Sequence, residues 1–202
     1  CYKCAKQKEK IGGNNMKKIM VIGAGGIGSF LIPLLDRVNE YEINVWDDDI
    51  VEKKNLSYQD FYEDDVGKHK TDVMSYRYRN VKSHPYRVLT KKQLMGYDLV
   101  ICCVDNLELR RLLYLVDTEQ IKWLDLRAQA RNGLLISFQE NPDNFGILTN
   151  GPDGNFSCQG DEWDRSNAGV HFTHVAIAGM GAQWVQRYFA GDKTHTHVRL
   201  SI

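Results

Sequence analysis

Short apolar runs alternate with segments of helical periodicity along most of the chain. Apolar or β-branched runs predict extended segments at 18–22, 42–46, 84–89, 97–104, 122–126 and 134–139. Apolar residues spaced along one face predict helices at 28–39, 68–80, 106–118 and 170–188. This alternation of strands and helices predicts an α/β fold with a doubly wound, mostly parallel, Rossmann-like sheet.

Two polar stretches lie outside this alternating pattern. Residues 1–15 are rich in lysine and end in Gly-Gly-Asn-Asn, which predicts a flexible tail or linker before a single domain at 16–202. Residues 141–167 are rich in glycine and proline, which is typical of a long functional loop. The chain has 202 residues, 43% of them hydrophobic, so such a domain can bury a substantial core.

The charge balance and the cysteines narrow the functional classes. The 26 basic and 26 acidic residues cancel, so no basic excess supports binding to nucleic acid or to a membrane surface. No apolar run reaches the length of a membrane span. The five cysteines are odd in number, and Cys102 and Cys103 lie in an apolar run, as buried thiols do in a reducing cytoplasm. We therefore expect a cytoplasmic protein without a nucleic-acid or membrane partner.

A glycine-rich turn between the first strand and the first helix predicts a nucleotide site. Its glycines are Gly23, Gly25, Gly26 and Gly28, and such a turn lets backbone N–H groups face a phosphate. Asp47 ends the next predicted strand, at the distance where a carboxylate usually holds a ribose hydroxyl. The turn alone is a weak signal, because dehydrogenases, flavoproteins and nucleotide-activating enzymes share it, and because a tight turn can form without a ligand.

The acidic residues that end this strand need a further explanation. Asp47, Asp48 and Asp49 are consecutive, although one carboxylate suffices for a ribose. Three adjacent acids repel one another unless a cation, a base or solvent relieves them, so an exposed strand end is the simple alternative. More polar residues follow at fixed places: Asn55, Gln59, Lys70, Asp105, Asn106 and Arg110.

In this order the motifs resemble those of the ubiquitin-activating-type adenylyltransferase family, which includes the ThiF, MoeB and HesA proteins. The family pattern joins the glycine loop to Asp-x-Asp-x-Val-x-x-x-Asn-Leu-x-Arg-Gln, Asp-x-Gly-x-x-Lys, and an Asp-Asn pair with an arginine four residues beyond the Asn. The matching residues are Gly23, Gly25, Gly26, Gly28, Asp47, Asp49, Val51, Asn55, Leu56, Gln59, Asp65, Gly67, Lys70, Asp105, Asn106 and Arg110. The resemblance covers roughly residues 16–190, with 141–167 as a crossover loop and a small-residue helix near 179–191 that closes the fold.

The resemblance implies an adenylyltransferase that uses ATP and Mg²⁺. The glycine loop, Asp49 and Gln59 would lie close to the nucleotide, and Asp47 would hold the ribose hydroxyls. Asn55 would orient the phosphates. Lys70 would reach a phosphate as a point charge, with a solvated helix lysine as the alternative.

Two further matches follow the strand predicted at 97–104. The resemblance implies that Asp105 carries the magnesium ion, a hard cation suited to a carboxylate, although a helix N-cap is the alternative for this residue. Arg110 would anchor the helix that follows Asp105 or contact the tail of the substrate.

Tyr58 departs from the family pattern, which has arginine before the glutamine. A tyrosine cannot stabilise phosphate charge as a planar, permanent cation does. The change could slow adenylation, mark a degenerate subunit, or be covered by one of three other arginines: Arg77, Arg79 and Arg127.

Some members of the family pass the activated carboxylate to a cysteine, and others stop at the adenylate. Cys158 lies in the glycine-rich stretch, where a thiol can be reactive, so it is a candidate acyl carrier or else an incidental loop cysteine. Many relatives bind zinc through two Cys-x-x-Cys pairs, but only Cys1 and Cys4 have that spacing here. His195 and His197 could complete a set, but two histidines in a polar C-terminal stretch are usually only a tail, so we expect no zinc.

Three functions from different classes are consistent with these residues. The leading one is ATP- and Mg²⁺-dependent adenylation, by a homodimer, of the C-terminal carboxylate of a small ubiquitin-like or sulfur-carrier protein or of a peptide. The second is a non-catalytic family subunit that docks the protein substrate for an active partner, which Tyr58 supports. The third is an NAD-dependent oxidoreductase, which leaves Asn55, Lys70 and Asp105 without a role.

Overall fold

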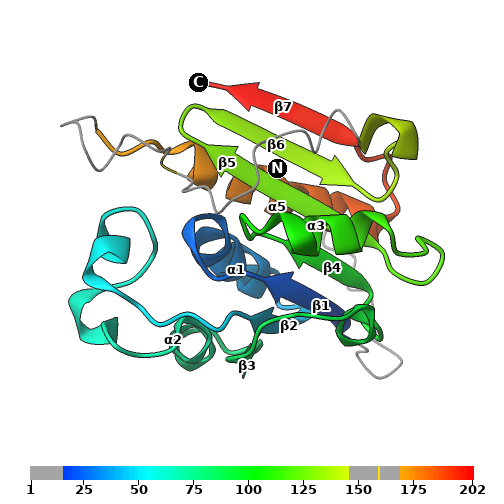
Figure 1. Cartoon of the computed structure of the whole chain (residues 1–202). Helices are drawn as coiled ribbons and strands as arrows, with labels where there is room; N and C mark the ends of the chain where they lie inside the picture. The colour runs from blue at the N-terminus through cyan, green and yellow to red at the C-terminus, as the bar shows by residue number, and fades with distance from the viewer. Residues whose placement is uncertain (1–15, 146–158, 160–168) are drawn as a thin grey trace, which may run out of the picture.

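The computed structural model describes residues 16–145, 159 and 169–202, and its centre is one seven-stranded sheet (Figure 1). The strands are β1 (Lys17–Ile22), β2 (Tyr41–Trp46), β3 (Val81–His84), β4 (Leu99–Cys102), β5 (Trp123–Gln129), β6 (Asn132–Ser137) and β7 (His197–Ser201). They lie in the order β3-β2-β1-β4-β5-β6-β7. The first five in this order are parallel, and β6 and β7 pair antiparallel. The direction in which strands are added reverses between β1 and β4, which is where open α/β sheets bind their ligands.

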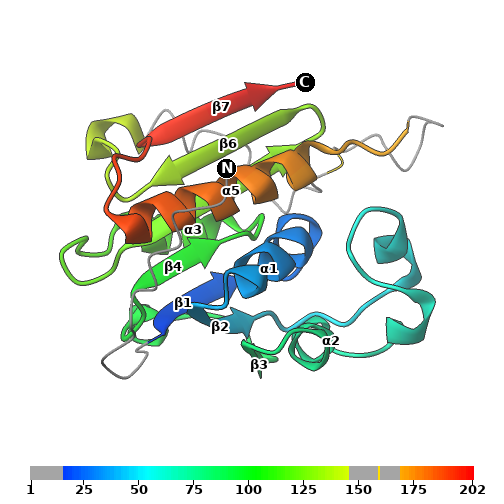
Figure 2. The ribbon, with the colours of Figure 1, turned by 180° about the vertical axis from the view of Figure 1, so that it is seen from behind.

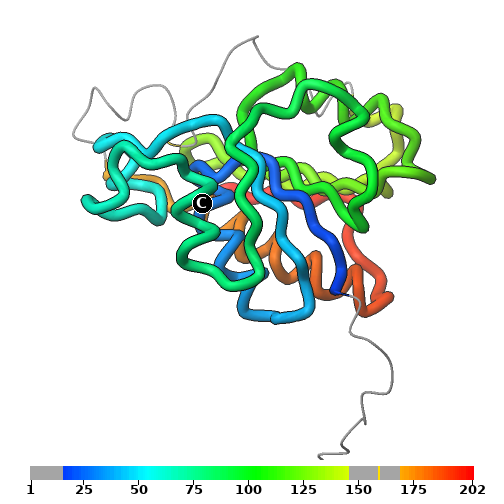
Figure 3. Tube along the Cα trace, turned by 90° about the horizontal axis from the view of Figure 1, so that it is seen from below, coloured from blue at the N-terminus to red at the C-terminus, as the bar shows by residue number. Residues whose placement is uncertain are grey.

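Helices cover both faces of the sheet. They are α1 (Gly26–Val38), α2 (Lys70–Arg77), α3 (Leu107–Tyr114) and α5 (Thr173–Ala190), with short 3-10 helices η1 (Lys53–Ser57), η2 (Glu63–Asp65), η3 (Lys91–Leu94) and η4 (Pro142–Asn144). Figure 2 shows α1 and α5 packed side by side on one face. Figure 3 shows the sheet between these two helices and the green segment that contains α3.

The central strand β1 is buried on both faces and divides the core into two clusters. Ile19 and Val21 pack with the residues of α1 and α5, whereas Met20 and Ile22 pack with Leu109 and its neighbours on the α3 side. A strand covered on both sides reads as a continuous apolar run, which is the pattern of residues 18–22. The doubly wound, mostly parallel fold predicted from the sequence is confirmed.

The long helix α5 approaches the sheet closely because glycines lie at the contacts. A Cβ at Gly181 would lie 2.6 Å from Cδ1 of Leu126, and a Cβ at Gly133 would lie 2.6 Å from Cγ1 of Ile177. The small-residue helix expected near the C-terminus therefore packs directly on β5 and β6. None of the helices in the described part of the chain is long and apolar enough to cross a membrane.

The expectation that the C-terminal stretch with His195 and His197 is a tail is wrong. Residues 197–201 form β7, which pairs with β6. Val198 and Leu200 pack against the core, and the three residues that alternate with them, His197, Arg199 and Ser201, are exposed. The alternation needed for a strand is present, but five residues give a weak signal.

Three other expectations differ in their limits. The extended segment predicted at 84–89 is wrong for most of its length, because the strand is β3, which ends at His84. The helices α2 and α3 are shorter than the predicted 68–80 and 106–118, because each ends within two or three turns. The predicted tail at 1–15 and most of the predicted crossover loop lie outside the described residues.

Candidate functional site

The carboxyl ends of the parallel strands border a cavity of about 380 Å³. It lies where the strand order reverses, at the crevice that such sheets use for ligands. Most of the residues predicted from the sequence line it: Gly23, Gly25, Gly26, Asp47, Asp49, Asn55, Gln59, Lys70, Asp105 and Arg110. Gly28 lies further along α1 and shapes the loop, and Cys158 lies outside the described residues.

The glycine loop connects β1 to α1 beside the cavity. Gly23 has a φ of 95°, a conformation that favours glycine. At Gly28 a Cβ would stand 1.9 Å from the carbonyl oxygen of Gly23, so a side chain there would prevent the close turn. The helix starts after Gly25 without a side-chain cap, so its first N–H groups are not satisfied in that way. An anion is the ligand that such a helix terminus favours.

Asp47, directly after β2, is held against the glycine loop by two backbone N–H groups. Its Oδ2 accepts a hydrogen bond from Ala24 N at 2.6 Å, and its Oδ1 accepts one from Asp49 N at 2.8 Å. Burial raises the pKa of Asp47 in spite of the nearby Lys70 ammonium. Each carboxylate oxygen has a further lone pair, so the group can also accept hydroxyl donors such as those of a ribose.

Lys70, the first residue of α2, lies in the cavity wall and is only 4% exposed. Its Nζ is 2.8 Å from Oδ2 of Asp49. An isolated antiparallel bridge between Ile50 and His69 brings the two segments together. The alternative of a solvated helix lysine is therefore wrong, and the ammonium can act as a point charge toward a phosphate.

The helix η1 and the turn after it place two buried amides at the cavity, Asn55 and Gln59. Oδ1 of Asn55 accepts from Glu52 N at 2.9 Å, and its Nδ2 lies 3.5 Å from the hydroxyl of Tyr58. Within the described residues, Oε1 of Gln59 is buried without a hydrogen-bond partner. Buried polar atoms are normally paired, so this acceptor favours a ligand or water donor in the cavity.

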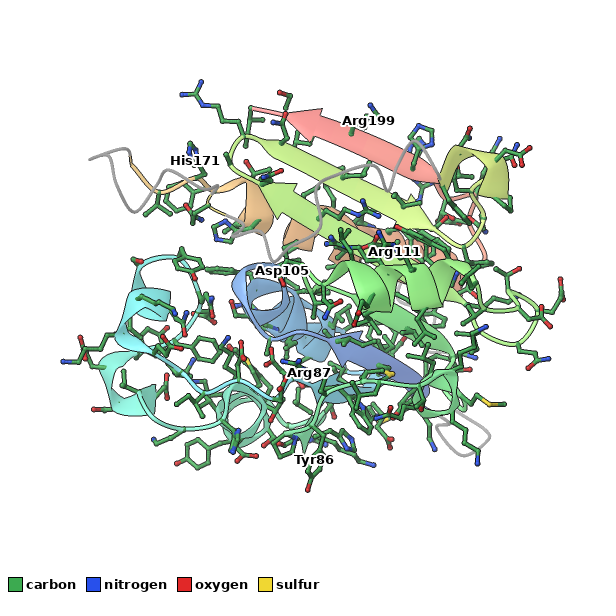
Figure 4. All side chains as sticks on the ribbon, in the orientation of Figure 1. Tyr86, Arg87, Asp105, Arg111, His171 and Arg199 are labelled. Carbon is green, nitrogen blue, oxygen red and sulfur yellow. The ribbon has the colours of Figure 1, made fainter. Side chains whose placement is uncertain are left out.

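Asp105 lies between β4 and α3 and lines the cavity. The N-cap of α3 is the next residue, Asn106. Oδ1 of Asn106 accepts from two backbone N–H groups of the first helical turn, at 2.8 and 3.2 Å. The alternative in which Asp105 is the N-cap is therefore wrong. Burial raises the pKa of Asp105, and the Asp49 carboxylate adds to this, whereas the Arg110 guanidinium opposes it. Figure 4 shows Asp105 near the amino end of α1.

A second cavity of about 250 Å³ adjoins the first on the α3 side of the strand ends. It shares Asp47, Asp49 and Asp105 with the larger cavity. At its edge, in the segment after β3, Arg87 pairs with Asp48 at 3.1 Å (Figure 4). Its apolar lining comes from five residues: Ile22, Trp46, Val88, Val104 and Leu109.

Arg110 and Arg127 line one side of the larger cavity, with Asp125 and Tyr114 packed behind them, and we call these four residues the β5 wall. The family motifs predict only Arg110 of the four. Asp125 is completely buried, with Nε of Arg110 at 3.3 Å from Oδ1 and Nε of Arg127 at 2.9 Å from Oδ2. Arg110 thus links α3 to β5 and also lines the cavity. The available sequence signal is the presence of two charged residues inside the apolar strand 122–126 and just after it.

Of the three arginines considered as replacements for an arginine at Tyr58, only Arg127 lines the larger cavity. Arg77 forms an ion pair with Asp65, and neither residue lines the cavity. Arg79 is exposed beyond the end of α2. Of the three candidate arginines, Arg127 is therefore the one that lies at the cavity.

The remaining sequence candidates are structural or lie outside the described part. Burial raises the pKa of Cys102 to about 12 and that of Cys103 well above its usual value, so neither thiol is easily ionised. Nδ1 of His197 lies 2.6 Å from Oε2 of Glu140, at the start of β7. The structure does not describe the other cysteines: Cys1, Cys4 and Cys158.

Sequence comparisons agree with the motifs. A model of the ThiF family matches residues 5–200. The SAMP-activating enzyme E1 of Haloferax volcanii is 34% identical over 106 residues, which cover 48% of this chain and 39% of that protein. The NEDD8-activating enzyme E1 catalytic subunit of Caenorhabditis elegans is 35% identical over 103 residues, which cover 46% of this chain and 24% of that protein. The matches therefore span well under half the length of either relative.

Solved structures share the fold at low sequence identity. E. coli MccB has a TM-score of 0.70 and 18% identity, over 92% of this chain and 59% of that one. The complex of E. coli MccB with ATP has a TM-score of 0.64 and 20% identity, over 87% of this chain and 56% of that one. PaaA has a TM-score of 0.66 and 19% identity, over 92% of this chain and 61% of that one.

Proposed function

Because the chain belongs to the ThiF family, we propose that it is an adenylyltransferase that uses ATP and Mg²⁺. Its substrate is the C-terminal carboxylate of a small ubiquitin-like or sulfur-carrier protein, or of a peptide. One observation carries this proposal: residues that are far apart in the sequence, from the glycine loop to Asp105, meet in a single cavity at the strand ends. An oxidoreductase would need only the glycine loop and Asp47, and would leave Asn55 and Lys70 without a role.

Each part of ATP has a suitable wall in the two adjoining cavities. The apolar lining of the smaller cavity suits the base, and Asp47, which both cavities share, suits the ribose. The amino end of α1 suits the phosphates, and Lys70 and Asn55 line the same cavity. The nucleotide would therefore lie across the strand ends, with its phosphates in the larger cavity.

The acidic side chains fit a magnesium ion. Asp105 and Asp49 both offer carboxylate oxygens to the larger cavity, and oxygen is the donor atom that Mg²⁺ prefers. Burial and the Asp49 carboxylate raise the pKa of Asp105, as expected for two acids that a cation would relieve. When bound there with the triphosphate, Mg²⁺ would neutralise part of the phosphate charge.

The reaction itself needs positioning more than acid–base chemistry. A carboxylate oxygen of the substrate forms a bond to the α-phosphorus, and the bond from that phosphorus to the oxygen bridging to the β-phosphate breaks. The products are an acyl-adenylate and pyrophosphate. The substrate acid is already ionised at neutral pH, so no general base is required. The N–H groups of α1 and the Lys70 ammonium would hold the phosphate oxygens during this step.

The acceptor is inferred from the relatives. One activates SAMP, another activates NEDD8, and E. coli MccB has been crystallised with MccA and AMPCPP. These names favour a small protein or a peptide with a free C-terminal carboxylate. We also propose a homodimer, as in the family's enzymes, and Cys158 as the candidate thiol for a later transfer step.

Pyrophosphate exchange tests the proposal. The chain is incubated with ATP, Mg²⁺, labelled pyrophosphate and a panel of carrier proteins and peptides with free C-termini, and label in ATP is measured. We expect exchange with at least one acceptor and its loss in Asp105→Ala. Asp192→Ala is the matched control, because Asp192 is an exposed carboxylate beyond the end of α5 and should leave exchange unchanged.

The same assay separates the alternatives. ATP binding without exchange for any acceptor would favour the second candidate, a non-catalytic subunit that docks the substrate, which the tyrosine at position 58 supports. Preferential binding of NADH over ATP would contradict both candidates.

A further inference from the structure

The β5 wall presents two guanidinium groups that share one buried carboxylate. Nε and one terminal nitrogen of Arg127 lie 2.9 and 2.8 Å from Oδ2 of Asp125, and Nε of Arg110 lies 3.3 Å from Oδ1. The hydroxyl of Tyr114 donates to Oδ2 at 2.5 Å and accepts from Arg127. These four groups therefore form one connected network behind the cavity.

The network fixes the plane of the Arg127 guanidinium. Two of its nitrogens are bonded to one carboxylate oxygen, and Tyr114 is itself packed against Trp123 with ring centroids 5.0 Å apart. A guanidinium held in this way loses little additional freedom when it binds an oxyanion. The side chain of Arg127 is 16% exposed, and the residue lines the larger cavity.

The network also favours the charged forms of Asp125 and Arg127 and the neutral form of Tyr114. Complete burial would raise the pKa of Asp125, but the Arg110 and Arg127 guanidiniums outweigh it, and the pKa is lowered. Burial and the Asp125 carboxylate raise the pKa of Tyr114, so its hydroxyl stays protonated. One carboxylate and two guanidiniums leave a net positive charge on this group of residues. Two guanidiniums that line a cavity attract an anion such as a phosphate.

The position of Arg127 along the sheet favours a phosphate of the nucleotide as the anion. The larger cavity is bordered by the glycine loop after β1, by Asp105 after β4 and by Arg127 near the end of β5. The order β1-β4-β5 places Arg127 on the far side of Asp105 from the glycine loop. Tyr58, which stands where the family has arginine, lines the same cavity.

We infer that Arg127 binds phosphate oxygens of ATP in place of the arginine absent at position 58, and that Asp125 and Tyr114 are positioning residues that hold its guanidinium. This inference rests on the proposed function for the identity of the nucleotide. It concerns binding, however, and can be measured without any acceptor.

Calorimetric titration of the full chain with ATP and Mg²⁺, and separately with adenosine, tests the inference. We expect Arg127→Gln to weaken ATP binding about tenfold or more, the loss typical of a charge-assisted hydrogen bond, and to leave adenosine binding unchanged. Adenosine thus reports that the variant is folded. Arg199→Gln is the matched control, because Arg199 is exposed on β7 (Figure 4) and should bind ATP as the wild type does.

Two more variants test the replacement itself. Tyr58→Arg in the Arg127→Gln background should recover part of the lost ATP affinity, because it restores a cation at the same cavity. Tyr114→Phe keeps the ring and removes one hydroxyl that holds Arg127. It should weaken ATP binding by a smaller factor than Arg127→Gln and leave adenosine binding unchanged.

Wild-type ATP affinity in Arg127→Gln would overturn the inference, whether or not exchange is seen. If that variant does not fold, Arg127→Lys decides, because a lysine keeps the charge but not the two-pronged geometry and should lose several-fold in ATP affinity. Unchanged affinity in Arg127→Lys and Tyr114→Phe would then overturn it. A wild-type chain that binds ATP but catalyses no exchange would contradict the proposed activity alone.

Discussion

The two walls of the larger cavity are built in different ways. In the glycine-loop wall, which consists of residues 23–28 and 47–70, the main ion pair has one buried and one exposed member: Lys70 is buried, and the Asp49 carboxylate is 61% exposed. The β5 wall surrounds Asp125, which is not exposed at all, with groups from both β5 and α3. The Lys70–Asp49 pair of the first wall is therefore hydrated at its carboxylate, whereas the Asp125 carboxylate of the second wall is balanced by protein groups only where it is paired. Removing a carboxylate should therefore change the free energy of unfolding by different amounts in the two walls.

The largest effect is expected from Asp125→Ala. This change removes the carboxylate that pairs Arg110 and Arg127 and leaves two guanidiniums in a buried place. Breaking a buried pair in this way costs about 3–5 kcal/mol of unfolding free energy. Urea unfolding followed by circular dichroism measures it.

Asp49→Ala is the matched change in the glycine-loop wall. Its carboxylate is largely exposed, but its removal takes away the ion-pair partner of the buried Lys70 ammonium, so we expect an intermediate loss of about 1–3 kcal/mol. Equal losses for Asp49→Ala and Asp125→Ala would show that burial does not distinguish the two walls.

Steric constraint, not charge, should dominate the glycine-loop wall. Gly28→Ala would place a Cβ 1.9 Å from the carbonyl oxygen of Gly23, so the turn must open. We expect a loss of about 1–3 kcal/mol in unfolding free energy, with weaker ATP binding. Urea unfolding and calorimetry measure the two effects.

Gly179→Ala in α5 is the control for a helical glycine. A Cβ there meets nothing within 4 Å, so this variant should be unchanged or up to about 1 kcal/mol more stable. A Gly28→Ala protein as stable as Gly179→Ala would show that the close turn is not required.

Lys70→Met separates binding from stability in the glycine-loop wall. Methionine can fill the buried site of the lysine stem, and the freed Asp49 carboxylate is exposed, so unfolding free energy should change by less than about 1 kcal/mol. ATP affinity should fall about tenfold, because a cation at the phosphates is lost. Lys68→Met is the control, since Lys68 is exposed just before α2. A large loss of stability in Lys70→Met would place this lysine with the β5 wall instead.

The difference between the walls also explains which residues of the site could be predicted from the sequence. The glycine loop, Asp47 and Lys70 follow short motifs with fixed spacing, and each motif forms a local structure such as the turn at Gly23 or the 3-10 helix around Asn55. Spacing is visible in a sequence, and so these residues could be named before the structure was known. The parallel sheet was equally visible, because a strand covered on both faces is apolar throughout.

The β5 wall could not be named in the same way. Asp125 and Tyr114 are brought together by the packing of α3 on β5, and no local spacing marks that contact. The short strand β7 was not predicted for a related reason: only two of its residues, Val198 and Leu200, give the apolar alternation of a strand. Both features depend on partners that are distant in the sequence.

A small effect is expected at Glu140, a carboxylate outside both walls. It accepts hydrogen bonds from Thr196 at 2.6 Å, from His197 at 2.6 Å and from Asn144 at 2.5 Å, so it has as many side-chain partners as Asp125. Its partners Thr196 and His197 are exposed, however. We therefore expect Thr196→Val to cost only about 0.5–1.5 kcal/mol at pH 7, as for a single hydrogen bond.

The pH dependence of that loss identifies its origin. Hydrogen bonds from Thr196, His197 and Asn144 lower the pKa of Glu140 from the usual 4.5 to about 2. A carboxyl group with a lowered pKa stabilises the fold above about pH 4.5, and this contribution disappears as the pH falls toward 2. The difference in urea midpoint between wild type and Thr196→Val should therefore shrink over this range. Thr194→Val, which removes a hydrogen bond to the neutral Gln139 amide, should show the same difference at every pH. If the two variants show the same pH dependence, the charge of Glu140 does not contribute to unfolding free energy. The expected loss in Asp125→Ala could then not be attributed to its charge and burial by analogy with Glu140.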